Sequence, residues 1–579
     1  MNQENGQLNT GKPDGPARDF LLLTLLWLVS IVIVNPIGDF PLNDDWSFGL
    51  AVGYFLQTGS FHPTGWTAMP LITNVLWGSL FCLPAGFSFT ALRFSTLVAA
   101  WLGMGGVYWL MREIRQPRLL AFLAAFSVAF NPIYFQLSNS FMTDVLSLTL
   151  MVFSAIFFLK NLKDNSPASL GIATVISLAA ILSRQVGLAV PLAFAIVAVC
   201  QRGLKPRAVL TAMSPLILGA FTLAAFQHWL KAAGRWPADY SSGSTFMLSG
   251  LNSPARSAFH LVHNSYKCVM YLGFFLAPVL VFLGPGSGDL RGKKWLPLAF
   301  IWLGLAGLVI VGGCYGHGFT MPLGGNTMNV WGMGPLTLHD VIYEDVPRIP
   351  MLGLGFWLPV TLISWVAAGL ILYRLGTIAW KLSPGMLTPA AEPGAFAGLF
   401  LLLVSLIYAA PFLLNGFYDR YLIAIIPFLI GGLAFYRPQN PLASPIVCRV
   451  TITFLAIGFL VYSVGGAKDY LAWNRARWTA LDDLMANEKI KPANIDGGLE
   501  FNGYYLYRSA YKVVPGKSLW WVDDDSYMVT FNPIPGYRAF HSYHYPHWLP
   551  PFTGDIFMLK KDPTNLSATP VPSEPSAAH

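Results

Sequence analysis

The sequence predicts an all-α polytopic membrane bundle followed by a small α+β domain. Of the 579 residues, 54% are hydrophobic and 11% are charged, whereas about 25% are charged in soluble globular proteins. Apolar segments suited to crossing a bilayer recur throughout residues 20–466. Residues 467–562 differ in composition and contain no such segment. Together these observations exclude a soluble enzyme and a disordered chain.

Residues 1–19 form a polar tail, and the transmembrane domain is expected to occupy residues 20–466. Phe20 to Val34 is an unbroken apolar run, so it is the first predicted span, since a span needs about 20 mostly apolar residues. Twelve further segments bring the predicted total to thirteen. They lie near 89–110, 119–135, 144–159, 168–182, 186–200, 208–228, 266–283, 296–313, 351–373, 395–414, 421–436 and 450–466.

The distribution of basic residues predicts the orientation of these spans. Loops on the side of the N-terminal tail carry 17 Lys and Arg residues, against 6 in the longer loops on the opposite side. Basic loops stay in the cytoplasm. We therefore expect a plasma (inner) membrane protein with a cytoplasmic N-terminus. An odd number of spans then places the C-terminal domain outside, in the periplasm.

Residues 467–562 are predicted to form this extracytoplasmic α+β domain. Val, Tyr and Asp alternate with turn residues there, which favours short strands. A helix is expected near 468–488 and strands near 493–496, 526–531 and 554–559. The Pro-, Ser- and Ala-rich segment 563–579 is expected to be a disordered tail.

The long first outer loop, residues 37–88, holds the first candidate site residues. It has no Lys or Arg, and it places Asp44, Asp45 and Trp46 at the start of an amphipathic stretch. Such a stretch lies in the membrane interface. Capping of this helix is one explanation for the two acids. A catalytic role is the other, because an ionisable residue at membrane depth is a functional candidate.

Asp144 is the third candidate acid, at the outer end of the fourth predicted span. An acid at a helix N-terminus is favoured by the helix dipole, so capping is again an alternative. One aspartate can cap a helix and also face a site.

Basic residues are rare on the outer side, which makes Arg93, Arg184 and Arg420 candidates for binding a phosphate. Snorkelling to lipid headgroups is the alternative for Arg93. Pairing with a nearby acid, such as Asp419, is the alternative for Arg420.

The Gly-rich outer loop 314–350 carries further cavity candidates in His317, Asn326 and Trp331, and Tyr421 follows Arg420. Aromatic and amide side chains suit a sugar. The histidines lack the spacing of a metal site. Phosphate-binding motifs for nucleotides and the HExxH helix are also missing, and the charge does not indicate nucleic acid. Nucleotide sugars stay in the cytoplasm, so transfer chemistry on the outer side needs an activated donor that is carried in the membrane.

The chain resembles the C-type (GT-C) membrane glycosyltransferases. The resemblance is strongest to the bacterial family 39-like group, which includes the aminoarabinose transferase of lipid A and the protein O-mannosyltransferases. It covers roughly residues 20–160 and 415–430. The stretches that carry it are Asp44-Asp45-Trp-Ser-Phe-Gly-Leu-Ala with Gly59, Leu92-Arg93-Phe94, Asn131-Pro132, Phe141-Met142-Thr143-Asp144-Val145 and Asp419-Arg420-Tyr421-Leu422 with Pro427.

The chain also departs from this family. The usual Asp-Glu pair is Asp44-Asp45 here, and Ala68-Met69-Pro70 replaces the Lys-Pro-Pro element, whose lysine is a donor-phosphate candidate in the aminoarabinose branch.

The resemblance implies transfer of a sugar from a polyprenyl-phosphate carrier to an acceptor hydroxyl, with inversion. The acceptor is a lipid, a glycan or a protein. Asp44 is the expected base. Asp45 and Asp144 would orient the acceptor or hold a divalent metal such as Mg or Mn, if one is used. Arg420, Arg93 and Arg184 would stabilise the leaving phosphate. A transporter or flippase of a lipid-linked substrate and a surface-polysaccharide polymerase or ligase are the alternatives.

Overall fold

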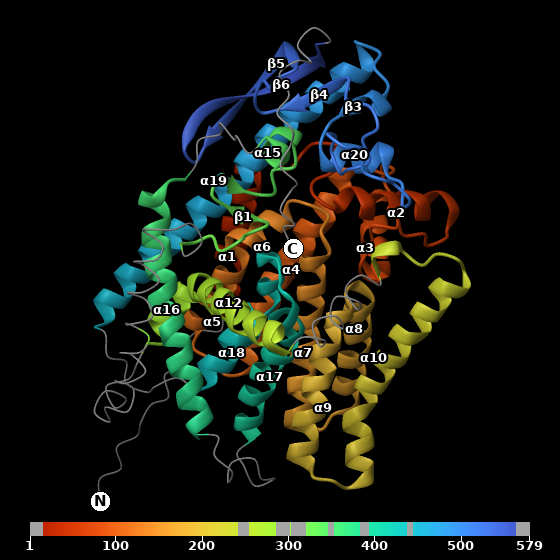
Figure 1. Ribbon diagram of the computed structural model, residues 1–579. Helices are drawn as coiled ribbons and strands as arrows, with labels where there is room; N and C mark the ends of the chain where they lie inside the picture. The colour runs from red at the N-terminus through yellow and green to blue at the C-terminus, as the bar shows by residue number, and fades with distance from the viewer. Residues whose placement is uncertain are drawn as a thin grey trace, which may run out of the picture.

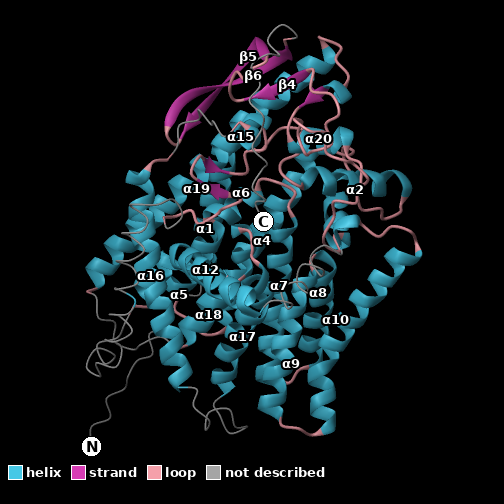
Figure 2. Cartoon of the chain, viewed as in Figure 1, coloured by secondary structure: helices cyan, strands magenta, loops and turns pink. Residues whose placement is uncertain are grey.

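The chain folds into a helical bundle with a small sheet at one end (Figures 1 and 2). The computed structural model describes residues 15–240, 254–284, 302, 320–344, 352–381, 393–436 and 444–562. Within these ranges, nine helical segments are long and apolar enough to cross a membrane. They comprise α1 (Gly15–Val34), α4 (Phe89–Glu113), α7 (Thr143–Asp164), η1 (Gln185–Leu188) with α9 (Ala189–Arg202), α10 (Pro206–Ala232), α12 (Pro254–Phe282), α16 (Leu354–Lys381), α17 (Pro393–Asn415) and α19 (Pro445–Ala486).

Nine of the thirteen predicted spans coincide with these segments. Of the other four, one is bent, one is a shorter helix, one lies outside the described residues, and 421–436 is not a continuous helix. The segment 119–135 is broken into α5 (Arg118–Ala129) and α6 (Pro132–Ser138), which are bent by 60°. The segment 168–182 is α8 (Pro167–Ser183), an apolar helix of 17 residues. The segment 296–313 lies outside the described residues.

The prediction of a continuous span over 421–436 is wrong. The chain forms η3 (Asp419–Ala424) and then the short helix α18 (Ile426–Phe435). Pro427 lies at the start of α18, where a missing N–H is tolerated, whereas inside a longer helix it would remove a hydrogen bond. Every residue from Ile426 to Ala434 is buried, so this broken segment lies inside the protein, where irregular backbone at membrane depth is tolerated.

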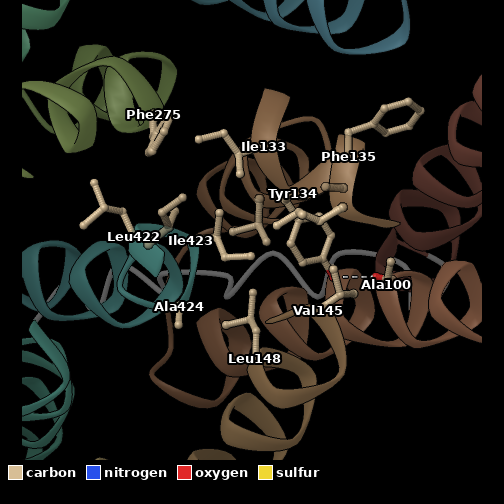
Figure 3. Packing of buried hydrophobic residues seen from close by; sticks show 14 of the residues in the cluster. Ala100, Ile133, Tyr134, Phe135, Val145, Leu148, Phe275, Leu422, Ile423 and Ala424 are labelled. Carbon is tan, nitrogen blue, oxygen red and sulfur yellow. Dashed lines mark hydrogen bonds between the residues drawn. The ribbon is translucent and has the colours of Figure 1, made fainter. Parts of the chain in front are cut away.

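Packing in the bundle holds η3 in place. Figure 3 shows Leu422, Ile423 and Ala424 of η3 beside Phe275 of α12 and Leu148 of α7. All five side chains are buried. Close packing is what holds elements together in a membrane bundle, so η3 is anchored at residues 422–424, just after Arg420.

The neighbouring part of this core belongs to the broken pair α5 and α6. Asn131 caps α6 by accepting from the amides of Ile133 and Tyr134, at 3.0 and 3.2 Å. The Tyr134 hydroxyl donates to the carbonyl of Ala100 in α4, at 3.0 Å (Figure 3). The bend is therefore fixed by a capping residue and a buried hydrogen bond.

The long helix α19 connects the bundle to the C-terminal sheet. It has 42 residues and so extends about 63 Å at 1.5 Å per residue. The helix predicted at 468–488 is thus the C-terminal part of α19 and not a separate element. The C-terminal sheet has the strand order β3-β4-β6-β5, with β3 parallel to β4 and the other pairs antiparallel.

Three of the four sheet strands match the sequence-based expectation. These are β3 (Ile495–Asp496), β4 (Tyr527–Thr530) and β6 (Pro551–Lys561). The longest strand, β5 (Tyr537–Trp548), was not predicted, because most of its side chains are exposed and its sequence shows no apolar alternation. Short helices α15 (His339–Tyr343) and α20 (Leu499–Leu506) lie between this sheet and the bundle (Figure 1).

Candidate active site

A cavity of about 560 Å³ lies where the bundle meets the C-terminal region. Its walls come from five parts of the chain. The first outer loop and the start of α2 (Asp45–Thr58) contribute one wall, and η2 (Ala238–Tyr240), loop 320–344, η3 and the C-terminal region contribute the others. The side chains that line it include Asn43, Asp44, Trp66, Asp239, Asn326, Trp331, Thr337, Tyr418, Arg420, Tyr421, Leu499 and Trp520.

An ion pair between Asp44 and Arg420 lies at this cavity. Arg420 Nη2 donates to Asp44 Oδ2 at 3.0 Å, and Trp66 Nε1 donates to Asp44 Oδ1 at 3.0 Å. Asp44 is the residue before α2, but its side chain makes no capping hydrogen bond. The capping explanation therefore does not account for Asp44.

Arg420 keeps donors that the described protein does not use. It is buried, and its Nε and Nη1 atoms have no hydrogen-bond partner among the described residues. Its guanidinium lies 5.3 and 5.7 Å from the ring centroids of Tyr418 and Tyr421. Burial lowers the pKa of Arg420, but the carboxylates of Asp44 and Asp144 raise it above its ordinary value. Arg420 is therefore a permanent cation with free donors, which suits an anionic ligand.

A second ion pair joins Asp144 and Arg184 behind Tyr421. Arg184 Nη1 donates to Asp144 Oδ1 at 2.7 Å and to the Thr143 hydroxyl at 3.1 Å. The Arg184 guanidinium lies 5.1 Å from the Tyr421 ring centroid. Tyr421 thus contacts both guanidiniums. Arg184 does not line the cavity, whereas Tyr421 does.

Asp45 faces away from the cavity and holds two loops together. Its carboxylate accepts the amides of Leu42 at 2.5 Å and Phe141 at 3.0 Å. Its side chain is 1% exposed, and burial raises the pKa of Asp45 to about 7. Both oxygens are already used by backbone donors, so this geometry is that of a structural residue.

Arg93 and Trp46 also lie away from the cavity lining. Arg93 donates to the carbonyls of Pro36, Gly38 and Phe40, at 2.5, 3.1 and 2.9 Å. It is 1% exposed, so it does not snorkel to headgroups. Trp46 is fully buried in an aromatic cluster with Trp66, Tyr507 and Trp521.

The described part of loop 314–350, which was predicted to supply cavity residues, does line the cavity. Asn326 and Trp331 face it, and the Asn326 Oδ1 and Trp331 Nε1 atoms have no partner in the described part of the chain. Asp419 fixes this loop by accepting the amides of Thr327 and Met328, at 3.0 and 2.7 Å. His317 lies outside the described residues.

Asp239 is a cavity residue that sequence reasoning passed over. Burial and the nearby charge of Asp44 raise its pKa. In the sequence, Asp239 is one of several acids in loops predicted to lie on the outer side, and it belongs to no motif. Trp66 and Trp520 also line the cavity, and nothing in their local sequence distinguishes them from other interface tryptophans.

The described ranges contain no group of three or more His, Cys, Asp or Glu side chains placed to hold a metal ion. The Asp44 oxygens accept from Arg420 and Trp66, and Asp144 pairs with Arg184. Asp45 and Asp144, the residues expected to hold Mg or Mn, do not form a ligand set. Both Asp45 oxygens accept backbone amides, and of the Asp144 carboxylate only Oδ2 is without a partner among the described residues.

Residues 69–230 match the family model of the dolichyl-phosphate-mannose-protein mannosyltransferases. The predicted resemblance is confirmed over residues 69–160, where this match overlaps it. The match includes Asp144 and Arg184, while Asp44 and Arg420 lie outside it. Among curated proteins, none matches the chain.

Solved structures of two proteins are similar to the chain. The archaeal oligosaccharyltransferase AglB from Archaeoglobus fulgidus, in complex with an inhibitory peptide and a dolichol-phosphate, is 14% identical with a TM-score of 0.41. The match covers 83% of this chain but 59% of AglB. ArnT from Cupriavidus metallidurans, bound to undecaprenyl phosphate, is 13% identical with a TM-score of 0.35, over 96% of this chain and 100% of ArnT. With scores this low, the fold description rests on the chain's own elements.

Proposed function

We propose that this polytopic membrane protein is a glycosyltransferase that moves a sugar from a polyprenyl-phosphate carrier to an acceptor hydroxyl, with inversion. The observation that carries the proposal is Arg420, a buried cation with unpartnered Nε and Nη1 atoms, held beside Asp44 at a cavity. A carboxylate and a phosphate-binding cation are the two groups that this reaction needs in one place.

In the proposed reaction, Asp44 is the general base. The acceptor oxygen forms a bond to the anomeric carbon of the sugar and gives its proton to an Asp44 oxygen. The bond between that carbon and the phosphate oxygen breaks, and its electron pair leaves with the carrier phosphate. Arg420 stabilises the departing charge, because donors aimed at developing charge lower the barrier in a water-poor site.

Asp144 and Arg184 are proposed to position the phosphate site. The guanidiniums of Arg184 and Arg420 both contact the ring of Tyr421, which lines the cavity. Arg184 would therefore act on the phosphate site by holding Tyr421 in place. The unpartnered Asn326 Oδ1 and Trp331 Nε1 atoms are suited to sugar hydroxyls. Asp45, Arg93 and Trp46 are proposed to support the loops that carry these groups.

The proposed place of the reaction is the outer face of the inner membrane. The support is the excess of Lys and Arg in the loops on the side of the N-terminus. A lipid-carried donor reaches this face, whereas nucleotide sugars stay in the cytoplasm. The acceptor class, whether lipid, glycan or protein, is an outcome of the test.

A transfer assay tests the proposal. Purified full-length protein is mixed with total polyprenyl-phosphate sugars of the host and host membranes as acceptor, beside the Asp44→Asn variant. Loss of sugar from the carrier with wild type alone supports the proposal. Movement of labelled carrier across vesicles without bond cleavage would indicate a transporter instead. Long-chain products would indicate a polymerase or ligase.

A further inference from the structure

Glu500, in the C-terminal region, contacts the residue next to the proposed base. Its Oε1 atom accepts the backbone amide of Asn43 at 2.9 Å. Its Oε2 atom accepts the Thr337 hydroxyl at 2.6 Å and Arg477 Nη1 at 2.8 Å. Asn43 and Thr337 both line the cavity, on separate walls. One carboxylate therefore ties two cavity walls to the C-terminal region.

The backbone of Asn43 needs such a tie. Asn43 has φ of +58°, in the left-handed region that residues other than glycine adopt at a cost, although asparagine tolerates it better than most. This turn sends the Asp44 side chain to the cavity. A hydrogen bond to a carboxylate is stronger than a neutral one, so Glu500 favours this turn over the relaxed alternatives.

Arg477 of α19 supplies the opposite charge that the buried Glu500 carboxylate requires. Arg477 and Glu500 are both completely buried, and a buried carboxylate needs a paired charge and satisfied hydrogen bonds. Arg477 also donates to the carbonyl of Gly497 through Nε and Nη2, at 2.9 and 2.6 Å. Glu500 is thus held from its own region and has Oε1 available for Asn43.

We propose that Glu500 is a positioning residue of the transferase, through which the C-terminal region fixes Asp44 beside Arg420. The inference rests on the proposed function for its catalytic consequence, but the structural link can be tested without any reaction. It gives the C-terminal region a role in catalysis beyond supplying Leu499 and Trp520 to the cavity wall.

The test uses full-length protein with Glu500→Gln, Glu500→Asp and a matched control, Asp525→Asn. Asp525 is also a buried carboxylate of the C-terminal region, paired with Lys561 at 2.9 Å, and it does not line the cavity. Glu500→Asp keeps the charge opposite Arg477 but shortens the reach to Asn43. It therefore serves if Glu500→Gln fails to fold.

Hydrogen exchange of peptides covering residues 40–48 is the first measurement. We expect these peptides to exchange about tenfold faster in both Glu500 variants and to be unchanged in Asp525→Asn. Glutamine has a single acceptor oxygen, and turning it to Arg477 leaves its NH2 group facing the Asn43 amide, whereas aspartate is too short to reach that amide. Unchanged exchange in the Glu500 variants would overturn the proposal, whether or not the wild type transfers sugar.

Kinetics give the second measurement. We expect the transfer kcat of the Glu500 variants to fall about 10- to 100-fold, as expected for a misplaced catalytic group. The Kd for undecaprenyl phosphate, used as the probe, should stay the same. An equal loss of kcat in Asp525→Asn, or lost probe binding in the Glu500 variants, would show a general structural effect. If the Glu500 variants exchange faster than wild type at residues 40–48 but the wild type transfers no sugar, the proposed function alone is refuted.

Discussion

Replacing Arg420 with lysine tests whether its unpartnered nitrogens bind the carrier phosphate. In the wild type, Nη2 serves Asp44 while Nε and Nη1 have no protein partner in the described chain. Lysine keeps the charge, but its single ammonium cannot hold Asp44 and span the same phosphate contacts. A hydrogen bond to a charged group contributes about 1.5–3 kcal/mol. Loss of one such bond therefore predicts roughly 10- to 150-fold weaker binding, since each ~1.4 kcal/mol is tenfold.

The assay is a titration of purified protein with undecaprenyl phosphate, followed by tryptophan fluorescence. Trp66, Trp331 and Trp520 line the cavity and report occupancy. Undecaprenol, which lacks the phosphate, measures binding of the chain alone and should not distinguish wild type from Arg420→Lys.

The matched control is Arg235→Lys. Arg235 donates to the Ser60 hydroxyl at 2.7 Å and the Phe61 carbonyl at 2.6 Å, and it does not line the cavity. Phosphate-dependent binding should survive this change. The reasoning fails if Arg420→Lys binds undecaprenyl phosphate within about threefold of wild type, a difference of less than ~0.7 kcal/mol.

Three further predictions follow from the site. Asp44→Asn should lower the transfer rate by about 10²–10⁴-fold, as for a lost general base, while undecaprenyl phosphate binds as in wild type or more tightly, because Arg420 loses its partner. Equal transfer rates would assign the base elsewhere. The pKa of Asp45 is raised from 3.8 to about 7 in the folded chain, so the folded state binds this proton more tightly. Stability should therefore fall as pH rises from about 4 to about 7. In thermal melts, Asp45→Asn should remove that slope, and a slope unchanged in the variant would contradict the assignment. Treatment with EDTA should leave the transfer rate unchanged, because the oxygens of Asp44 already accept from Arg420 and Trp66 and those of Asp45 accept from two backbone amides. Activity lost with EDTA and restored by Mg or Mn would refute this.

Much of the bundle could be predicted because its spans are encoded locally. Apolar length alone located nine of the spans found in the described residues. The segment 421–436 was misread because its composition is that of a span. Its break at η3 depends on tertiary contacts with α7 and α12. Apolar composition predicts that a segment is buried, but it does not distinguish one long helix from two short elements.

The site could be predicted only where residue type and topology were enough. Asp44 and Arg420 are 376 positions apart, yet both are rare charges at outer ends, and they meet at 3.0 Å. Arg93 has the same local signature as Arg420, but its donors are used by backbone carbonyls of the first outer loop. Glu500 gave no signal at all, since its importance depends on partners in three distant segments.

The adjacent acids Asp44 and Asp45 show why sequence motifs need geometry. Successive residues at the start of a helix point about 100° apart, so two neighbouring carboxylates reach different surroundings. Asp44 reaches a cation and a cavity, whereas Asp45 reaches two backbone amides that join the first outer loop to the start of α7. Of the two acids, the proposed base therefore faces the cavity, while its neighbour joins two parts of the backbone. The second places the first, because the loop that Asp45 fixes at Leu42 and Phe141 is the loop that carries Asp44.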